Sequence, residues 1–376
     1  MLRIGINGRS LFRQLTGVQH YAREVTRALC VLEPGDVDFT VFAGREGRGA
    51  GEDLPLAASP VPANGPIQGM VWEQTVLRRM AGKACTDVLF NPANLAPLFP
   101  PVPSVVTIHD LSFLLFPEYF SRSFGVYYRH IIPMIIDQST AIITDSESSR
   151  KDLVEHLGAP PDKVTAIHLG VSPVFRGRIR KEDLETVRRR HGLPQKFFLS
   201  VSSLEPRKNL ARLVQAYRML TPEVKEDQKL VLVGAGNRLF ADPGLSGELA
   251  RIAAGAVVTP GYIPEEDLPA VYRMATALVF PSLYEGFGLP VLEAMAAATP
   301  VITSNRSSLP EVAGQAAVLV DPESTEEIAA AMELVAQDSG ARNLLIERGK
   351  KRASGFTWEK TAKQTLAVLK TAAGVF

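Results

Sequence analysis

The chain contains few of the residues that build disulfide frameworks or metal clusters. Its 376 residues include two cysteines, Cys30 and Cys85, and six histidines that show no metal-ligand spacing. Two scattered thiols do not form a disulfide framework, and they are typical of proteins in a reducing compartment. We therefore expect a cytoplasmic location.

Long hydrophobic runs and an excess of one charge are also absent. No stretch approaches the ~20 apolar residues of a membrane-spanning helix, and the apolar part of the opening MLRIGINGR is far too short for a signal peptide. The 41 basic and 40 acidic side chains give a net charge of +1, which provides no overall attraction to nucleic acid or to an anionic membrane. We expect a protein that is neither secreted nor inserted and has no nucleic-acid partner; a local basic face is still compatible with this charge.

What the chain does contain is the pattern of two α/β domains. Its hydrophobic content of 46% and charged content of 22% are ordinary for a globular protein. Short apolar runs alternate with helical segments such as Val18–Leu29, which predicts parallel strands with helices on both faces of each sheet. The expected strands are Leu2–Asn7, Asp38–Phe42, Asp87–Phe90, Ser104–His109 and Thr140–Asp145, followed by Phe197–Ser202, Lys229–Gly234, Ala256–Thr259, Ala277–Pro281, Pro300–Thr303 and Ala317–Val320.

A charged segment separates the two series of strands. Arg176–Arg190 carries seven basic and three acidic residues and little apolar content, which is typical of a linker with a solvated helix. We therefore expect a doubly wound, Rossmann-like domain over residues 1–175, a linker over 176–194, a second such domain over 195–355 and a final helix over 356–376, with Thr357 as its N-cap. In folds of this kind ligands bind outside the carboxyl ends of the strands.

Two groups of polar residues follow predicted strands and are therefore candidates for a site. His109 and Asp110 end the strand SVVTIHD, although a hydrogen-bonded structural histidine would give the same pattern. Arg207 and Lys208 lie in a loop that enters a helix. Arginine can bind a diphosphate through forked hydrogen bonds and lysine as a point charge, whereas exposed loop cations are commonly just solvated.

The stretch YEGFGLPVLEAMA, Tyr284–Ala296, carries two carboxylates, Glu285 and Glu293, around a glycine-containing turn. Pro290 suits a first helical position, which would place Glu293 in the first helical turn and Glu285 in the loop. Amides at a helix start attract phosphate, and carboxylates accept hydrogen bonds from hydroxyls. A nucleotide sugar has both groups. Alternatively, Glu293 only complements the helix dipole and Glu285 is a surface acid.

Two further motifs are weak. Gly234–Leu239, GAGNRL, has leucine at the third glycine position of the dinucleotide fingerprint, so a tight strand-to-helix turn explains it better than NAD binding. Asp36 and Asp38 precede a strand and follow Pro34-Gly35, so turn chemistry explains them better than a metal site.

Several segments together resemble the retaining glycosyltransferases of family 4, which have the GT-B fold. The stretch from Glu285 to Glu293 is similar to the E-x7-E motif of that family, and the likeness extends to bacterial polysaccharide and O-antigen mannosyltransferases. The other matching segments are Thr16–Tyr21, Asp87–Pro92, Ile108–Asp110, Thr144–Ser146, Ser203–Asn209, Pro260–Ile263 and Phe356–Trp358.

The resemblance implies how the second domain binds a nucleoside-diphosphate sugar. Glu293 is expected to accept from the ribose hydroxyls and Glu285 to contact the donor sugar. Lys208, with Arg207, is expected to hold the diphosphate and to stabilise it as it leaves. Gly286, Phe287, Gly288 and Leu289 are expected to contact sugar and phosphate, and Tyr262 and Ile263 to lie beside the base.

In the first domain the resemblance places Gly17 near the phosphates and His109 near the donor sugar, and the final helix should cross back to this domain. We thus expect His109, Lys208 and Glu285 to be catalytic, with retention of anomeric configuration. Family members usually need no metal, so we expect no cofactor. One departure concerns Ser202-Ser203, where many relatives carry Gly-Arg or Gly-Thr; Arg207 is the candidate to replace the missing arginine.

The expected donor is GDP-mannose or another nucleotide sugar, and the expected acceptor is a saccharide or a polyprenyl-linked saccharide of a cell-surface polysaccharide. Phe113–Met134 mixes aromatic residues with Arg122, Arg129 and His130, and Trp72 lies near Arg78 and Arg79 in the sequence. These segments could touch lipid headgroups at the inner face of the cytoplasmic membrane, or could simply be core with solvated charges. Two alternatives stay open: an epimerase or phosphorylase on the same scaffold, and a non-catalytic nucleotide-sugar-binding protein.

Overall fold

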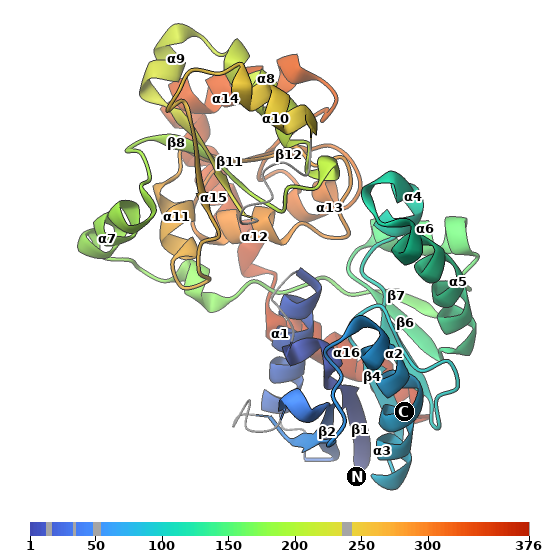
Figure 1. Ribbon diagram of the computed structural model, residues 1–376. Coiled ribbons are helices and arrows are strands. Elements are labelled where there is room, and N and C mark those ends of the chain that lie inside the picture. The colour runs from blue at the N-terminus through green and yellow to red at the C-terminus, as the bar shows by residue number, and fades with distance from the viewer. Residues whose placement is uncertain (13–16, 33–34, 48–53, 235–242, 376) are drawn as a thin grey trace. The chain divides into compact units, whose positions relative to one another are not determined.

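The structure is a computed structural model that describes residues 1–375 apart from 13–16, 33–34, 48–53 and 235–242. It consists of two compact units (Figure 1). Unit 1 comprises Met1–Gly170 together with Thr357–Phe376, and unit 2 comprises Val171–Phe356. The segment 176–194, predicted as a linker, is counted in unit 2, where helix α7 (Lys181–His191) packs against α11 (Leu268–Met274).

Each unit is built on a parallel sheet. In unit 1 the seven strands have the order β3-β2-β1-β4-β5-β6-β7, and in unit 2 the six strands have the order β10-β9-β8-β11-β12-β13. The prediction of two doubly wound α/β domains is confirmed. The strands are β1 (Leu2–Asn7), β2 (Val37–Ala43), β3 (Leu56–Ala58), β4 (Val88–Asn91), β5 (Ser104–Thr107), β6 (Ala141–Thr144), β7 (Val164–Ala166), β8 (Phe197–Val201), β9 (Lys229–Val233), β10 (Val257–Gly261), β11 (Ala277–Phe280), β12 (Val301–Ser304) and β13 (Val318–Val320).

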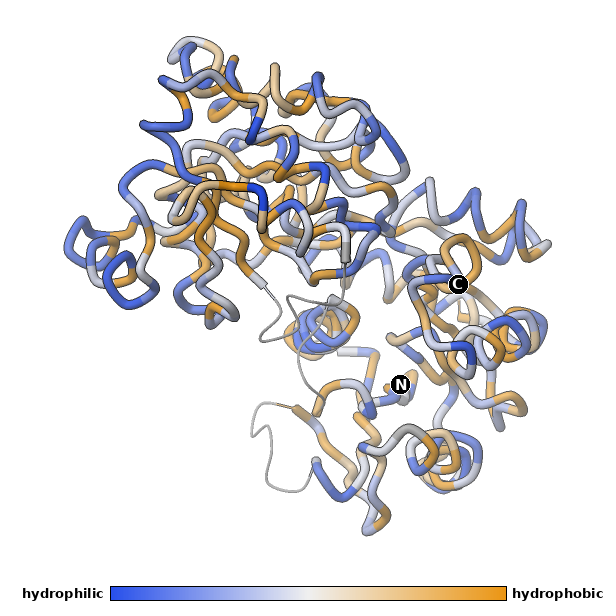
Figure 2. The backbone as a smooth tube through the Cα atoms, turned by 45° about the horizontal axis from the view of Figure 1, so that its top comes forward, coloured by the Kyte–Doolittle hydropathy of each residue, from blue (hydrophilic) through white to orange (hydrophobic). Residues whose placement is uncertain are grey.

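Helices connect the strands and cover the sheets. They are α1 (Gly17–Val31), α2 (Pro66–Trp72), α3 (Arg78–Lys83), α4 (Ser112–Leu115), α5 (Arg122–Gln138), α6 (Glu147–Leu157), α7, α8 (Leu210–Met219), α9 (Pro222–Asp227), α10 (Pro243–Ala250), α11, α12 (Leu289–Ala296), α13 (Leu309–Ala313), α14 (Thr325–Gln337), α15 (Ser339–Ser354) and α16 (Trp358–Ala372), with short 3₁₀ segments between some of them. Many coils of the tube are orange on one side and blue on the other, as expected for amphipathic helices (Figure 2).

The sequence prediction missed the short edge strands β3 and β7. Each has only three residues, LAA and VTA, which is too short to stand out as a strand in the sequence. By contrast, the central strands β4, β5 and β11 are buried along their whole length, as expected for parallel strands covered on both faces. Several predicted strands also end earlier than expected, so that His109, Asp145 and Ser202 lie in the loops that follow β5, β6 and β8.

The chain returns to unit 1 through α16, which packs against α1. Thr357 caps this helix as predicted, since its side chain accepts from Lys360 N. Thr361 Oγ1 donates to His168 O at 2.7 Å, and a Cβ atom at Gly170 would collide with the backbone nitrogen of Trp358. The last helix is therefore held tightly against the segment 168–170, where the chain first leaves unit 1.

Candidate functional site

Three loops of unit 2 meet at the carboxyl edge of its sheet. They follow β8, β11 and β12, which are neighbours in the strand order. Leu283 N donates to Arg207 O at 2.8 Å, which joins the first loop to the second, and Glu285 N donates to Ser307 Oγ at 3.0 Å, which joins the second to the third. The predicted meeting of the Arg207-Lys208 loop with the Glu285 loop is thus present in the structure.

Charged side chains of these loops form one cluster. Lys208 Nζ lies 2.6 Å from Glu285 Oε1, and Arg207 Nη1 lies 3.3 Å from Glu285 Oε2. Glu205 also contacts Arg207, with 2.6 Å between Oε2 and Nε, and accepts from Ser203 Oγ at 2.8 Å. The sequence analysis did not predict these direct ion pairs, and it did not identify Glu205 as a member of the cluster. Ser203 thus orients Glu205, and Glu205 in turn holds Arg207.

Glu285 is buried but ionised. Burial by itself raises the pKa of its carboxyl group, but the charges of Lys208 and then Arg207 outweigh burial, so the pKa lies below its ordinary value. A buried carboxylate held by two cations is fixed in position, and it can exchange a cation for a hydroxyl donor. Glu285 is therefore not the exposed surface acid of the alternative interpretation.

The glycine turn between Glu285 and α12 is held from beneath by the loop after β12. Ser308 Oγ donates toward two carbonyl oxygens, Glu285 O at 2.9 Å and Phe287 O at 2.8 Å. Gly288 has φ 110°, and a Cβ atom there would lie 2.6 Å from Leu309 Cδ2, so only glycine fits. Sequence reasoning missed Ser307 and Ser308. Their position just after a strand of the same sheet was the signal that could have identified them.

The position of Glu293 differs from the prediction. Helix α12 begins at Leu289, so Pro290 is its second residue and Glu293 lies beyond the first turn. The reason is that Gly288 caps the helix, one residue earlier than expected. Glu293 Oε2 accepts from Tyr272 OH at 2.8 Å, a partner that the sequence did not predict. Leu289 N, in the first turn, has no intrahelical acceptor.

The two residues that were expected to lie beside the base of the donor are also in unit 2. Tyr262 follows β10 directly and is 65% exposed, whereas Ile263 is buried. Gly234, at the end of β9, has φ 131° and donates through its backbone nitrogen to Gly261 O at 3.1 Å. A Cβ atom at Gly234 would overlap Ser202 O, so this glycine allows two loops to approach closely. The rest of GAGNRL, residues 235–239, lies outside the described residues.

His109 lies in unit 1, after β5, and its imidazole points into the protein. Its Nδ1 is 2.8 Å from Asp145 Oδ2 and its Nε2 is 3.1 Å from Pro92 O, so both ring nitrogens have acceptors. The backbone is held as well, since Asn94 Oδ1 accepts from His109 N. Burial lowers the pKa of the imidazole, but the charge of Asp145 outweighs it, so the pKa is raised above 6.5.

Gly17 is the first residue of α1 and is exposed, while Thr16 lies outside the described residues. Tyr21, one turn further along α1, packs edge-on against His109, with 4.8 Å between the ring centroids. The two predicted site residues of unit 1 are thus connected through Tyr21.

The aromatic segments that were predicted to touch lipid divide into buried and exposed residues. Trp72 is fully buried and its Nε1 donates to Ser59 Oγ at 3.0 Å, so this residue belongs to the core, the second of the two alternatives. Phe113 is also buried in the core. Arg122, Arg129 and His130 are exposed on α5.

No helix in the described parts of the chain combines the length and apolar character needed to cross a bilayer. In the same residues, no three histidine, cysteine or acidic side chains are grouped as ligands for a metal ion.

Comparison with known families gives a match to both units. The model described as Glycosyltransferase Family 4 matches residues 15–175, and the model described as Glycosyl transferases group 1 matches residues 183–352.

Named relatives give the same picture. The chain is 35% identical over 268 residues to O-antigen chain mannosyltransferase B of Escherichia coli, a match that covers 71% of this chain and 70% of that protein. It is 29% identical over 271 residues to serotype-specific mannosyltransferase WbdA of Escherichia coli, where the match covers 70% of this chain but 32% of the relative.

Solved structures share the fold over almost the whole chain. The structure of Anabaena HepE in complex with UDP-glucose has a TM-score of 0.78 at 17% identity and covers 99% of this chain and 100% of its own. WaaG, a glycosyltransferase involved in lipopolysaccharide biosynthesis, has a TM-score of 0.73 at 14% identity and covers 98% and 99%. At these identities the likeness shows the fold alone.

Proposed function

The chain belongs to glycosyltransferase family 4 and is a hexosyltransferase with the GT-B fold, and from this we propose that it transfers mannose from a nucleoside-diphosphate sugar such as GDP-mannose to a saccharide. Mannose is supported by the names of the relatives, O-antigen chain mannosyltransferase B and serotype-specific mannosyltransferase WbdA. The same names support an acceptor in cell-surface polysaccharide synthesis, either a free or a polyprenyl-linked saccharide.

The proposal rests chiefly on the charged cluster beside the glycine turn. Lys208 and Glu285 neutralise each other across 2.6 Å, and a nucleotide sugar carries complementary groups for both. In the proposed complex the diphosphate takes Lys208 and Arg207, and Glu285 turns to hydroxyls of the sugar. Lys208 then stabilises the negative charge that develops on the leaving diphosphate.

The remaining donor contacts are assigned from the positions of the other site residues. Glu293 binds the ribose hydroxyls, and the backbone of Gly286, Phe287, Gly288 and Leu289 contacts sugar and phosphate. The exposed Tyr262, followed by Ile263, flanks the base.

Gly17 and His109 belong to unit 1, where we propose that they face the phosphates and the donor sugar. Because both His109 ring nitrogens are held by Asp145 and Pro92, we assign His109 a positioning role. Through these two contacts the imidazole keeps the loop after β5 in place.

The proposed reaction retains the anomeric configuration and uses no metal or other cofactor. The bond between the anomeric carbon and the diphosphate breaks, the acceptor hydroxyl attacks from the same face, and its proton passes to the departing diphosphate. The enzyme would work in the cytoplasm, with peripheral contact to the inner face of the membrane where a lipid-linked acceptor is presented.

A thermal-shift panel of GDP-, UDP- and dTDP-sugars tests the donor, because a ligand that binds the folded state raises its melting temperature. Release of nucleoside diphosphate that depends on a mannan-type acceptor tests transfer and separates it from mere binding, and NMR of the product anomer tests retention. An unchanged rate with EDTA is expected. Donor binding without acceptor-dependent release would overturn the proposed transfer.

A further inference from the structure

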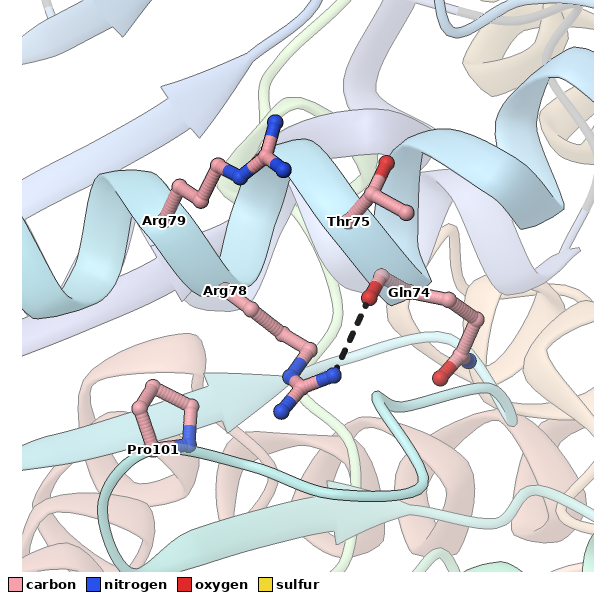
Figure 3. Close-up of a pocket in the computed structure, with 5 residues that line it drawn as sticks. All are labelled: Gln74, Thr75, Arg78, Arg79 and Pro101. Carbon is pink, nitrogen blue, oxygen red and sulfur yellow. Dashed lines mark hydrogen bonds between the residues drawn. The ribbon is translucent and has the colours of Figure 1, made fainter.

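Unit 1 contains a pocket away from the residues discussed so far. It has a volume of about 330 Å³ and is lined by Gln74, Thr75, Arg78, Arg79 and Pro101 (Figure 3). This is at the small end of the range of ligand pockets, ~300–1,000 Å³. It is therefore large enough for a compact polar group and not for a whole nucleotide sugar.

The pocket is built by a helix with a wider turn in its middle. Helices α2 and α3 are joined by the π-helical turn η3 (Glu73–Leu77), so the three segments run on without a break. Gln74 lies four residues before Arg78, and Thr75 lies four residues before Arg79, which gives two adjacent rows on the helix surface (Figure 3).

The opposite wall is fixed to this helix by Gln74. Its Nε2 donates to Ala96 O at 3.2 Å, and its Oε1 accepts from Leu98 N at 2.9 Å. The segment that runs on to Pro101 is thus tied to the same side chain that lines the pocket. The two walls are therefore preformed.

The two guanidinium groups of the pocket have no carboxylate partner among the described residues. Arg78 Nη1 lies 3.5 Å from Gln74 O, the limit for a hydrogen bond, and Arg78 Nε is buried without an acceptor. By contrast, Arg9 of the same unit pairs with Glu73 at 2.5 Å, and Arg3 with Asp87 at 2.9 Å. A guanidinium group without a carboxylate partner is available to pair with an anion in the pocket.

Exposed apolar side chains occur on the two segments that form this pocket. Ile67 and Val71 occupy the two preceding turns of the helix and are 75% and 56% exposed. Phe99, between Leu98 and Pro101, is 62% exposed. A ligand that joins an anion to hydrocarbon would satisfy both kinds of surface, since guanidinium groups match phosphate geometry and burial of apolar area is favourable.

We propose that this pocket binds the phosphate group of a lipid, with Arg78 and Arg79 holding the phosphate and Ile67, Val71 and Phe99 contacting the hydrocarbon or the lipid surface. The inference deepens the acceptor side of the proposed function and rests on it only for the idea that the acceptor is presented on a lipid phosphate. The lipid site does not depend on donor binding. The thermal-shift panel of donors can therefore fail while vesicle binding is confirmed, and vesicle binding can fail while the donor is confirmed.

Flotation with vesicles tests the site. Wild-type protein is expected to float with phosphatidylcholine vesicles that contain phosphatidic acid and not with phosphatidylcholine alone. The variant Arg78→Gln/Arg79→Gln is expected to bind at least about tenfold more weakly. A matched control is Lys350→Gln/Lys351→Gln, which removes two exposed positive charges from α15 and should float like the wild type.

Melting-temperature measurements verify that each variant is folded. The single variant Arg79→Gln, at an exposed position, is expected to lose part of the vesicle binding. Flotation of Arg78→Gln/Arg79→Gln equal to that of the wild type would overturn the proposal. So would equal losses in the Lys350→Gln/Lys351→Gln control, since net charge and not the pocket would then explain binding.

A second arm separates a lipid phosphate from a soluble one. Val71→Ser/Phe99→Ser is expected to weaken vesicle binding several-fold while leaving the arginines in place. Glycerol phosphate is expected to compete only weakly with the vesicles. Undiminished flotation of this variant, together with full competition by glycerol phosphate, would contradict a lipid ligand and assign the pocket to a soluble phosphate.

Discussion

Lys208 Nζ and Glu285 Oε1 lie 2.6 Å apart, although 77 positions separate the two residues in the chain. The pair connects the loop after β8 with the loop after β11, and both side chains are about nine-tenths buried, with 11% and 10% exposed. In the proposed complex the phosphate competes with Glu285 for Lys208. We therefore expect phosphate binding to weaken the hold of Lys208 on this carboxylate.

Replacement of Lys208 by alanine should remove the group that stabilises the leaving diphosphate. We expect kcat/KM to fall by about 10²–10³-fold. The control is Lys196→Ala, which removes an exposed lysine of the same unit paired with Asp227 and should leave kcat/KM unchanged. An unaltered kcat/KM in Lys208→Ala would remove Lys208 from the mechanism.

Glu293→Ala should weaken binding of the nucleoside diphosphate by at least about tenfold, because two ribose hydroxyls lose a charged acceptor. Calorimetry with the free nucleotide measures this directly. Tyr272→Phe is the matched variant: it removes the hydroxyl that donates to Glu293 Oε2 and keeps the carboxylate. Normal nucleotide binding by Glu293→Ala would leave Glu293 with a structural role, such as its contact to Tyr272.

Ser308→Ala should loosen the glycine turn. It leaves the carbonyl oxygens of Glu285 and Phe287 without this donor, which should cost about 1–3 kcal/mol of the free energy of unfolding and raise KM for the donor. Ser324→Ala removes the N-cap of α14 and should cost about 1 kcal/mol without a change in KM. Equal KM values in the two variants would disprove the role given to Ser308.

The His109–Asp145 pair should make stability depend on pH. Because the folded pKa of His109 is raised above 6.5, its stabilising contribution is complete below about 6.5 and is lost as pH rises through the folded value. The loss of unfolding free energy in His109→Gln should therefore be larger at pH 6 than at pH 9, measured by urea denaturation. His156→Gln, at an exposed position on α6, should show no such trend, and a loss in His109→Gln that is the same at both pH values would contradict the charged pair.

The fold could be predicted because its signal is local. Apolar runs such as AIIT and ALVF predict buried strands, and the polar residues after them predict the edge of the sheet where a site lies. The loop that carries Glu285 and the Arg207-Lys208 loop became candidates for this reason, whereas the motif that includes Glu293 was proposed from a family resemblance.

The partners of the site residues could not be predicted in the same way. Ser308 beneath the glycine turn and Tyr272 beside Glu293 are set by packing between loops that are distant in the chain. The sequence left Trp72 open between a lipid-facing surface and the core, and in the structure the indole packs inward and bonds to Ser59. A sequence pattern gives the face of an element only when its period is regular, and η3, the π-helical turn directly after Trp72, interrupts that period.

The contact of α16 with α1 also determines the order in which the protein can be completed during synthesis. Residues 1–170 emerge from the ribosome first, but the helix that packs against them, Trp358–Ala372, is made only after all of unit 2. The first unit to be made is thus the last to be finished, and until then the face of α1 that α16 covers is exposed to solvent or to chaperones.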